Sequence, residues 1–400
     1  MKWKLKDLTV DGKGSYGIGA PAIPYQEDKL TYLRITDIND DGSLNFSDLK
    51  SVDAEDAEKY ILKENDIVFA RTGNSTGRSY FYEKQHGTFV YAGFLIKFSL
   101  DPNKVNPRIL KYYTHSKPYF DWVNSFDTGA TRGNINAKTY GDMEIELPSR
   151  KVQDKIVSIL SSLDRKIELN NKINADLEEM AQAIFKNWFV DFEPFKDGKF
   201  VDSELGMIPE GWKVGRLTEI ASYMNGLAMQ KYPPENNEDS LPVLKIKELG
   251  QGFCGTDSDR CSCNIKDECK IHNGDVIFSW SGTLLVDVWC GGDCGLNQHL
   301  FKVTSNDYPK WFYYYWTKHH LQEFIHIAKD KAVTMGHIKR GHLEEAMVAI
   351  PDNDSMEKAH ELFEPILSKM ISLRLESSRL SLLRDTLLPR LMSGELEVPE

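Results

Sequence analysis

The feature that most constrains the fold of this 400-residue chain is an internal repeat, because sequence patterns of the first half recur in the second half. Four patterns occur in the same order in both halves, at similar separations. Such a repeat predicts two similar globular units instead of one large core. The matches pair Trp3–Leu8 with Trp212–Leu217, Leu33–Ile38 with Leu244–Leu249, Asp66–Gly73 with Asp275–Gly282, and Gly133–Ile135 with Gly336–Ile338.

A heptad pattern follows each globular half. Apolar or small residues recur there at alternating steps of four and three, which is the spacing of a coiled-coil seam. Two such seams in one chain, separated by a globular domain, can close on each other as an antiparallel coiled coil. After Pro148 the seam positions are Ile156, Leu160, Leu163, Ile167, Asn170, Asn174, Leu177, Ala181 and Ile184. After Pro351 they are Ala359, Phe363, Ile366, Met370, Leu373, Ser377, Leu380, Arg384 and Leu387.

Two details of the seams have more than one interpretation. Asn170 and Asn174 are polar at seam positions. A buried asparagine there fixes the register of a helix pair at a cost in stability, which is the interpretation we favour. Alternatively, both face solvent or another subunit at a bend. Pro365 lies inside the second seam and predicts a kink or a late helix start near Glu364.

The globular halves combine helix and strand patterns. The segments 67–70, 89–92 and 94–98 read as strands, and helices are expected after Pro107 and Pro309. The fold class is therefore α/β (α+β), with two similar globular domains separated by two long helices and related by a pseudo-two-fold repeat. The expected divisions are 1–149, 150–195, 196–350 and 351–395.

The amino-acid sequence of the helical segments resembles that of the specificity subunits of type I restriction–modification systems. The resemblance covers essentially the whole chain. The cysteine-rich part of the second domain departs from the family pattern. The residues that carry the resemblance are Leu147-Pro148, Leu163-Asp164, Leu169-Asn170, Leu177-Glu178, Trp188 through Phe192, Gly206 through Trp212, and Leu387 through Leu396.

The resemblance implies two target-recognition domains, each reading one half of a split, asymmetric DNA sequence. The helices would set the spacing between the halves and dock two methyltransferase subunits, and ATP-dependent translocase/endonuclease subunits would join that core. Methyl transfer from S-adenosylmethionine to adenine N6, and the use of Mg and ATP, would belong to those partners. The helix from Val152 to Phe189 would be roughly 55 Å long at about 1.5 Å per residue, which exceeds one duplex turn of about 34–36 Å.

A search for catalytic motifs agrees with a subunit that is not an enzyme. Gly12 through Gly17 satisfies G-x-G-x-x-G, but Pro21 and Pro24 forbid the helix that dinucleotide binding needs. No G-x-x-x-x-G-K-[ST] phosphate loop occurs. Tyr232-Pro233-Pro234-Glu235 has the wrong flanks for an amino-methyltransferase motif. Asp352 and Asp354 fit helix N-caps better than metal ligands. No cofactor is therefore expected in this chain.

The net charge of −11 argues against strong binding of this chain alone to a polyanion. The acidic excess lies mostly after residue 200, and phosphate neutralisation supplies much of protein–DNA affinity, so partner subunits would have to contribute.

No apolar run approaches the roughly 18 residues of a membrane span. The N-terminus alternates charged and apolar residues without a signal-peptide core, so a cytoplasmic location is expected.

Base reading requires donors and acceptors on thin elements, with Arg–guanine and Asn–adenine the favoured pairs. Three glycine-containing loops in each half suit this role, although ordinary polar turns would look the same. Trp280 is more easily interpreted as core than as a base-stacking side chain. The candidate DNA-binding residues are Ser15, Tyr16, Arg71, Thr72, Asn74, Arg78, Thr131, Arg132, Asn134, Asn225, Trp280, Thr283, Lys331, Thr334, His337, Lys339 and Arg340.

Two further groups of residues have a structural and a functional interpretation. Trp188, Phe189 and Phe192 end the first helix and either pack into the core or bind a methyltransferase subunit; both roles could hold. All six cysteines lie between Cys254 and Cys294 with spacings that match no standard zinc knuckle, so reduced, unliganded thiols are favoured. The alternative is a zinc site built from Cys261, Cys263, Cys290 and Cys294. Disulfides are not expected in a cytoplasmic protein.

Two other classes of function compete with DNA specificity. A self-sufficient methyltransferase or nuclease would methylate or cleave DNA without partners, and the missing motifs count against it. A spacer or adaptor that binds only proteins would show no salt-sensitive, sequence-selective DNA binding when partners are added. The sequence leaves the bases that are read, the spacer length and the oligomeric state without partners undetermined.

Overall fold

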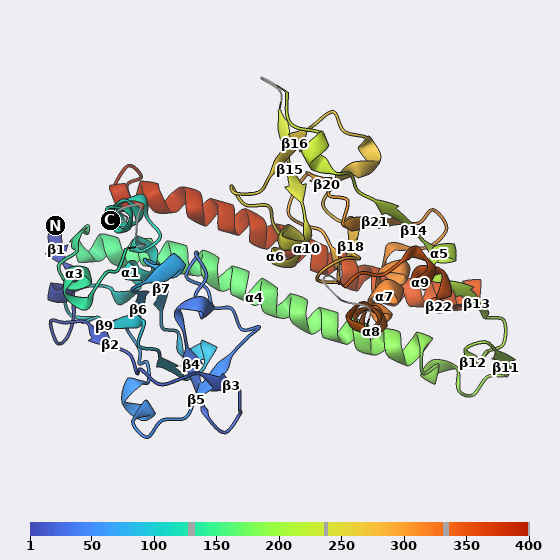
Figure 1. Ribbon diagram of the computed structural model, residues 1–400, viewed down its shortest axis with the longest axis horizontal. Helices are drawn as coiled ribbons and strands as arrows, with labels where there is room; N and C mark the ends of the chain where they lie inside the picture. Colours follow the sequence, from blue (N-terminus) through green and yellow to red (C-terminus); the bar gives the residue numbers. More distant parts are fainter. Residues whose placement is uncertain (127–132, 236–238, 331–335, 399–400) are drawn as a thin grey trace. The chain divides into compact units, whose positions relative to one another are not determined.

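The computed structural model describes residues 1–126, 133–235, 239–330 and 336–398. The chain forms two compact units (Figure 1). Unit 1 comprises Met1–Arg165 with Leu380–Glu400, and unit 2 comprises Lys166–Arg379. In the part of the chain that is described, no helix combines the length and the apolar character needed to cross a bilayer.

In the described residues, unit 1 contains two four-stranded sheets, one strand pair and three short helices, together with one end of each long helix. One sheet has the order β2-β9-β6-β7 and is antiparallel throughout. The other has the order β3-β5-β4-β8, in which β4 and β8 are parallel, and β1 pairs with β10. The bounds are β1 Lys2–Lys4, β2 Ser15–Tyr16, β3 Ile23–Pro24, β4 Leu30–Leu33, β5 Lys50–Val52, β6 Asp66–Ala70, β7 Ser79–Phe81, β8 Phe89–Tyr91, β9 Leu95–Ser99, α1 Pro107–Tyr113, α2 Lys117–Asn124, α3 Ala137–Gly141 and β10 Glu144–Glu146.

Unit 2 repeats this topology, which confirms the internal repeat. The antiparallel sheet β14-β21-β18-β19 corresponds to β2-β9-β6-β7, and β16-β15-β20, with β15 and β20 parallel, corresponds to β5-β4-β8. Strands β13 and β22 pair as β1 and β10 do, and an extra hairpin, β11–β12, precedes them. The bounds are β11 Phe200–Ser203, β12 Gly206–Pro209, β13 Lys213–Arg216, α5 Leu217–Ile220, β14 Ser222–Asn225, β15 Ser240–Leu244, α6 Ile246–Gln251, β16 Arg260–Ser262, β17 Lys270–Ile271, β18 Val276–Ser279, β19 Leu285–Val288, β20 Cys294–Leu296, β21 Leu300–Thr304, α7 Lys310–His319, α8 Leu321–Asp330, α9 Arg340–Glu345 and β22 Met347–Ile350.

Helix α4 runs over Arg150–Phe189 and helix α10 over Asn353–Ser393. Within unit 2 they are antiparallel, because Asn170 of α4 bonds to Ser377 while Phe185, further along α4, packs against Phe363. In unit 1 the carboxylate of Asp164 lies 3.1 Å from the guanidinium of Arg384. Every predicted seam position on both helices is buried or half-buried, which confirms the heptad pattern.

The polar seam positions and Pro365 resolve two of the open alternatives. Asn170 and Asn174 are both buried, so the solvent-facing interpretation is wrong. The late helix start near Glu364 is also wrong, because α10 begins at Asn353. Pro365 lies on the exposed side of α10, where water can reach the carbonyl that loses its helical hydrogen bond. Asp352 caps α10 as expected, its carboxylate accepting a 2.8 Å bond from the Ser355 amide.

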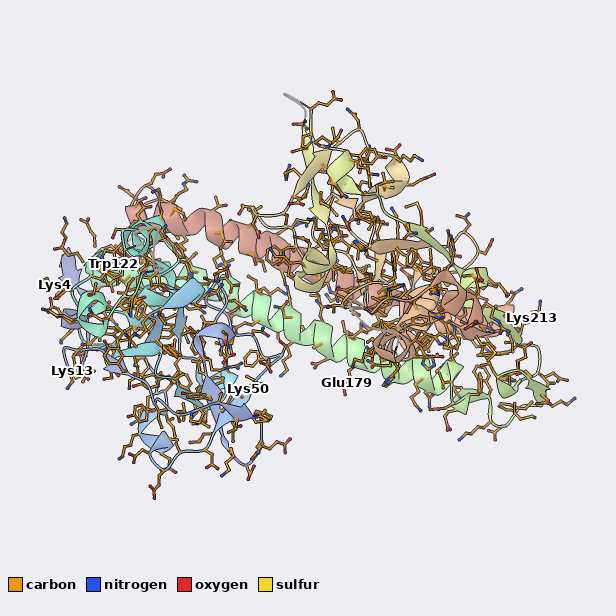
Figure 2. The ribbon with its side chains drawn as sticks, in the orientation of Figure 1. Lys4, Lys13, Lys50, Trp122, Glu179 and Lys213 are labelled. Atoms are coloured by element: carbon orange, nitrogen blue, oxygen red, sulfur yellow. The ribbon has the colours of Figure 1, made fainter. Side chains whose placement is uncertain are left out.

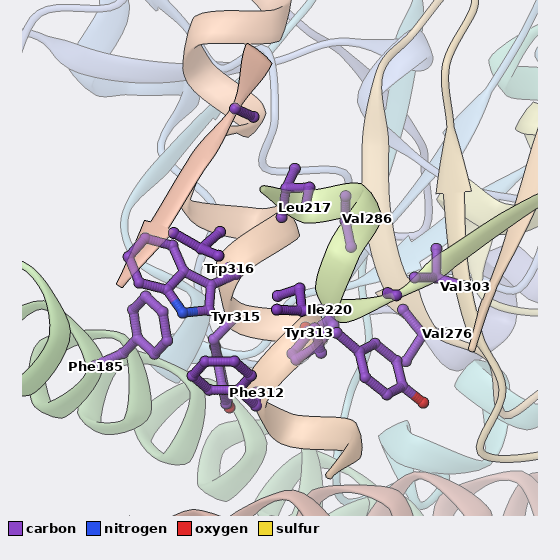
Figure 3. Close-up of a cluster of buried hydrophobic side chains, with 14 of the residues drawn as sticks. Phe185, Leu217, Ile220, Val276, Val286, Val303, Phe312, Tyr313, Tyr315 and Trp316 are labelled. Carbon is purple, nitrogen blue, oxygen red and sulfur yellow. The ribbon is translucent and has the colours of Figure 1, made fainter. Parts of the chain in front are cut away.

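The long helices supply core side chains to each unit. In unit 2 the ring of Phe185 on α4 lies 5.1 Å from that of Trp316 on α7 (Figure 3), and Trp311 stacks on Phe363 of α10 at 4.7 Å. In unit 1, Ile156 of α4 and Leu388 of α10 share one hydrophobic cluster. The compact units therefore divide within the helices, and the target-recognition boundaries expected from the sequence stay predictions.

Candidate nucleic-acid interface

Arg71 in unit 1 stands at the end of a buried strand. The preceding residue, Ala70, pairs with Leu95 across β6 and β9. One step further, the amide of Arg71 donates a 3.1 Å bond to the carbonyl of Phe94. Residues opposite each other on antiparallel strands project from the same face, so the side chains of Arg71 and Phe94 share a face where the sheet reaches the surface.

The guanidinium of Arg71 is held by an aromatic ring and an amide. Its carbon lies 5.0 Å from the ring centre of Tyr16 on β2. Its Nε and Nη2 donate 3.4 Å bonds to the Oδ1 of Asn134. The Tyr16 hydroxyl in turn accepts a 3.0 Å bond from the amide of Ala137. Because a guanidinium carries five N–H donors, this arrangement orients Arg71 while donors remain for a ligand.

The loop after Arg71 contains candidates with different surroundings. Asn74 is exposed, and Thr72 is half-buried. Arg78 is committed to the protein, because its Nε lies 2.6 Å from the carboxylate of Asp40 and its Nη1 donates a 3.0 Å bond to the carbonyl of Ile38. A DNA contact by Arg78 would therefore compete with an existing ion pair.

Trp280 in unit 2 occupies the position of Arg71. The preceding residue, Ser279, pairs with Leu300, and the amide of Trp280 donates a 3.4 Å bond to the carbonyl of His299. The indole lies 6.0 Å from the His299 ring, 5.8 Å from that of Phe301 and 6.4 Å from that of His337. Trp280 is half-buried, and its ring packs partly against the hydrophobic core of unit 2.

Two more pairs of positions match between the units: one precedes Ile135 and Ile338, and the other lies on β2 and β14. The amide of Ile135 donates to the carbonyl of Arg71 over 3.0 Å, and the amide of Ile338 donates to that of Trp280 over 3.1 Å. Asn134 and His337, which precede these isoleucines, are therefore equivalent. Tyr16 pairs with Ile96 and Asn225 with Phe301, so Tyr16 and Asn225 are equivalent as well.

A glycine directly after β2 and another directly after β14 hold these equivalent positions in the same backbone geometry. A Cβ at Gly17 would overlap the carbonyl oxygens of Tyr91 and Ala92, and one at Gly226 would overlap those of Leu296 and Asn297. Only glycine permits backbones to approach so closely. The same close approach in both units shows that the repeat extends to the backbone packing beside the candidate loops.

The other candidates are spread around these positions. Ser15 lies in β2 opposite Lys97, Thr283 and Lys339 are exposed, and the guanidinium of Arg340 donates a 3.5 Å bond to the carbonyl of Tyr223. Thr131, Arg132, Lys331 and Thr334 lie outside the described residues.

Phe94 and His299 are surface residues that the sequence interpretation missed. The pattern over 94–98 predicts that Phe94 lies in a strand, but β9 begins at Leu95 and Phe94 is 60% exposed. His299 is also exposed and opens onto a cavity of about 630 Å³. Three cations line that cavity, Lys245, Lys247 and Arg260. The glycine before Phe94 and the repeat alignment were the signals that could have identified the pair.

Many cationic side chains on the described surface pair with carboxylates, and Figure 2 labels two that do so, Lys4 and Lys50. The ammonium of Lys4, labelled there, lies 3.8 Å from Asp142. Lys247 at the unit 2 cavity lies 2.5 Å from Asp257, and Lys245 contacts Asp259. Arg71 has no carboxylate partner among the described residues, which separates it from these paired cations.

The aromatic residues at the end of α4 belong to the core of unit 2. Phe189 is 1% exposed and lies 5.7 Å from Trp212, ring centre to ring centre. Phe192 is also buried, and Trp188, half-buried, packs edge-on against Phe195. Burial supports the packing role for Phe189 and Phe192 and leaves them almost no surface for a partner.

Four of the six cysteines are divided between two hydrophobic clusters of unit 2. Cys261 is buried in one hydrophobic cluster of unit 2 and Cys294 in another, and burial raises the pKa of Cys290 to about 11. Across the described ranges, no three His, Cys, Asp or Glu side chains are grouped to hold a metal ion. The structure therefore gives no support to the zinc alternative.

Comparison with known proteins identifies similar chains. A family model described as the type I restriction modification DNA specificity domain matches residues 19–179 and 209–373. The MjaIX specificity subunit of Methanocaldococcus jannaschii, a type I restriction enzyme subunit, is 32% identical over 73% of this chain and 69% of its own length. The HindI specificity subunit of Haemophilus influenzae is 22% identical over 84% of this chain and 88% of its own length. The fold resembles that of a type I restriction-modification S subunit from M. genitalium, with a TM-score of 0.55 at 16% identity over 100% of this chain and 96% of that one.

Proposed function

Since this chain belongs to the DNA specificity subunits of type I restriction–modification systems, we propose that its two units each read one half of a bipartite, asymmetric DNA target. The observation that carries the proposal is the shared frame of the two units with different side chains at equivalent positions, such as Arg71 and Trp280. Two copies of one reader with different contact chemistry suit a target whose halves differ.

The long helices would set the spacing between the half-sites and dock the methyltransferase subunits. Helices α4 and α10 continue without interruption for 40 and 41 residues, which corresponds to roughly 60 Å each at about 1.5 Å per residue. Each also exposes large apolar side chains, which is typical of surfaces that bind another protein. These are Ile159, Leu382 and Leu383 in unit 1, and Leu169, Met180 and Leu362 in unit 2.

The chemistry would reside in partner subunits. Two methyltransferase subunits would bind S-adenosylmethionine and methylate adenine N6, and translocase/endonuclease subunits would use ATP and Mg. This chain would add sequence selectivity, and the complex would act in the cytoplasm, where it meets genomic DNA. Its net charge of −11 leaves most of the phosphate neutralisation to the partners.

The test is to assemble the chain with its methyltransferase subunits and map N6-methyladenine in the genomic DNA of cells that carry the complex. The expected result is one bipartite motif that disappears when this chain is omitted. DNA binding by the assembled complex should be sequence-selective and should weaken steeply with salt. Methylation by this chain alone would favour a self-sufficient enzyme, and assembly without sequence-selective DNA binding would favour an adaptor.

A further inference from the structure

We propose that four structurally equivalent positions form the base-reading surface of each unit, and that Phe94 and His299 are specificity-determining residues within it. In unit 1 the positions are Tyr16, Arg71, Phe94 and Asn134; in unit 2 they are Asn225, Trp280, His299 and His337. The inference rests on the proposed function and adds which side chains distinguish one half-site from the other.

The first argument is that the frame is shared while the side chains are not. In unit 1 a backbone hydrogen bond of 3.1 Å joins Arg71, directly after β6, to Phe94, directly before β9. In unit 2 the equivalent bond, of 3.4 Å, joins Trp280, directly after β18, to His299, directly before β21. If these positions only closed the end of the sheet, similar side chains would serve in both units. Instead a cation and a phenyl ring in one unit replace an indole and an imidazole in the other.

The second argument concerns exposure in unit 1. Phe94 is 60% exposed although its neighbour Leu95 is completely buried. An exposed phenyl ring on the same face as an oriented guanidinium would provide an apolar contact and a bidentate donor. Such a pair suits a thymine methyl group next to a guanine in the major groove. Arg71 is pre-organised for this role by the Tyr16 ring at 5.0 Å.

Unit 2 presents different chemistry at the same points. None of its four positions is an arginine, and Asn225 supplies the amide that pairs best with adenine. His299 is exposed at the mouth of the cavity of about 630 Å³. The Nε1 of Trp280 is buried with no hydrogen-bond partner among the described residues. The two units should therefore prefer different base pairs, with a guanine dependence in the half read by unit 1.

The experiment uses the complete complex with its methyltransferase subunits. Phe94→Ala and Arg71→Ala are compared with Phe46→Ala, whose side chain is 50% exposed elsewhere in unit 1. His299→Ala is compared with Phe253→Ala, which is 55% exposed elsewhere in unit 2. The readouts are the methylation motif of each variant and its affinity for duplexes in which one half-site at a time is altered.

The expected result is a loss of affinity of roughly tenfold to hundredfold for Phe94→Ala and Arg71→Ala, with relaxed selectivity at positions of the same half-site. His299→Ala should relax selectivity only in the other half, and the controls should match the wild type. Phe94→Ala and His299→Ala variants that retain the wild-type motif and affinity would overturn the inference. So would equal losses at both halves, which would indicate a structural defect. A wild-type complex without a bipartite motif would instead refute the proposed function.

Discussion

The side-chain amide of Asn170 donates a 3.3 Å hydrogen bond to the hydroxyl of Ser377, across the helix pair of unit 2. The same amide donates a 2.9 Å bond to the carboxylate of Glu376, while its Oδ1 has no partner among the described residues. Two polar seam positions thus meet each other at one level of an otherwise largely apolar seam. This pairing selects one register of the two helices, because a shift would place an amide against leucine.

Replacing both partners with apolar residues should stabilise the protein and make the register of the two helices less specific. We expect Asn170→Leu combined with Ser377→Ala to raise the free energy of unfolding by about 1–2 kcal/mol, since it removes a buried oxygen without a partner and extends the apolar seam. Thermal unfolding measures this change, and size-exclusion chromatography should show additional oligomers. Asn171→Ala, at an exposed position of α4, is the control. A less stable double variant would show that the polar pair contributes net stability.

The two glycines that fix the frame should be equally intolerant of a side chain. Gly17→Ala and Gly226→Ala should each destabilise the protein by about 2–3 kcal/mol, because the new Cβ meets backbone carbonyls that cannot move independently. Denaturant unfolding gives the values. Gly19→Ala and Gly250→Ala are matched controls, since no atom lies within 4 Å of a Cβ at either position. Equal stabilities for all four variants would contradict the close approach.

The repeat and the heptad seams predicted the fold because the spacing of apolar residues along a short stretch of sequence shows which side of a helix is buried. Seam positions such as Leu160 and Leu373 follow from spacing alone, and both are buried. The start of α10 was not predictable in this way, since the effect of Pro365 depends on which side of the helix faces solvent. Sequence could nominate Arg71 and Tyr16 separately, but their contact at 5.0 Å requires the pairing of β2 with β9 and of β9 with β6. For the same reason Phe94, one residue before a buried strand, could not be recognised as a surface residue.

Asp164 should make unit 1 sensitive to acid. Burial alone would raise the pKa of Asp164, but Lys111, Arg384 and a hydrogen bond from Tyr112 lower that pKa below its ordinary value. A carboxylate with a lowered pKa contributes stability that is present above its unfolded pKa, about 3.9, and is lost as pH falls below that value. Unfolding free energy should therefore decrease as the pH falls below about 4.

Removing this charge should reduce both stability and its pH dependence. We expect Asp164→Asn to cost about 2–4 kcal/mol at neutral pH, because it leaves two half-buried cations with one carboxylate fewer. The variant should also lose less stability than the wild type below about pH 4. Asp176→Asn, an exposed site on the same helix, serves as the control. Parallel stability–pH curves for wild type and Asp164→Asn would assign the acid sensitivity to other carboxylates.

The thiols of unit 2 should behave as buried, metal-free side chains. Burial raises the pKa of Cys261, Cys269 and Cys290, and a protonated thiol reacts slowly with electrophiles. Alkylation of the native protein should therefore be confined to the two half-buried residues, Cys254 and Cys263, whereas all six cysteines should react in denaturant. A strong chelator should leave the melting temperature unchanged. One equivalent of bound zinc, together with a melting temperature that falls on chelation, would instead show that a metal organises these cysteines.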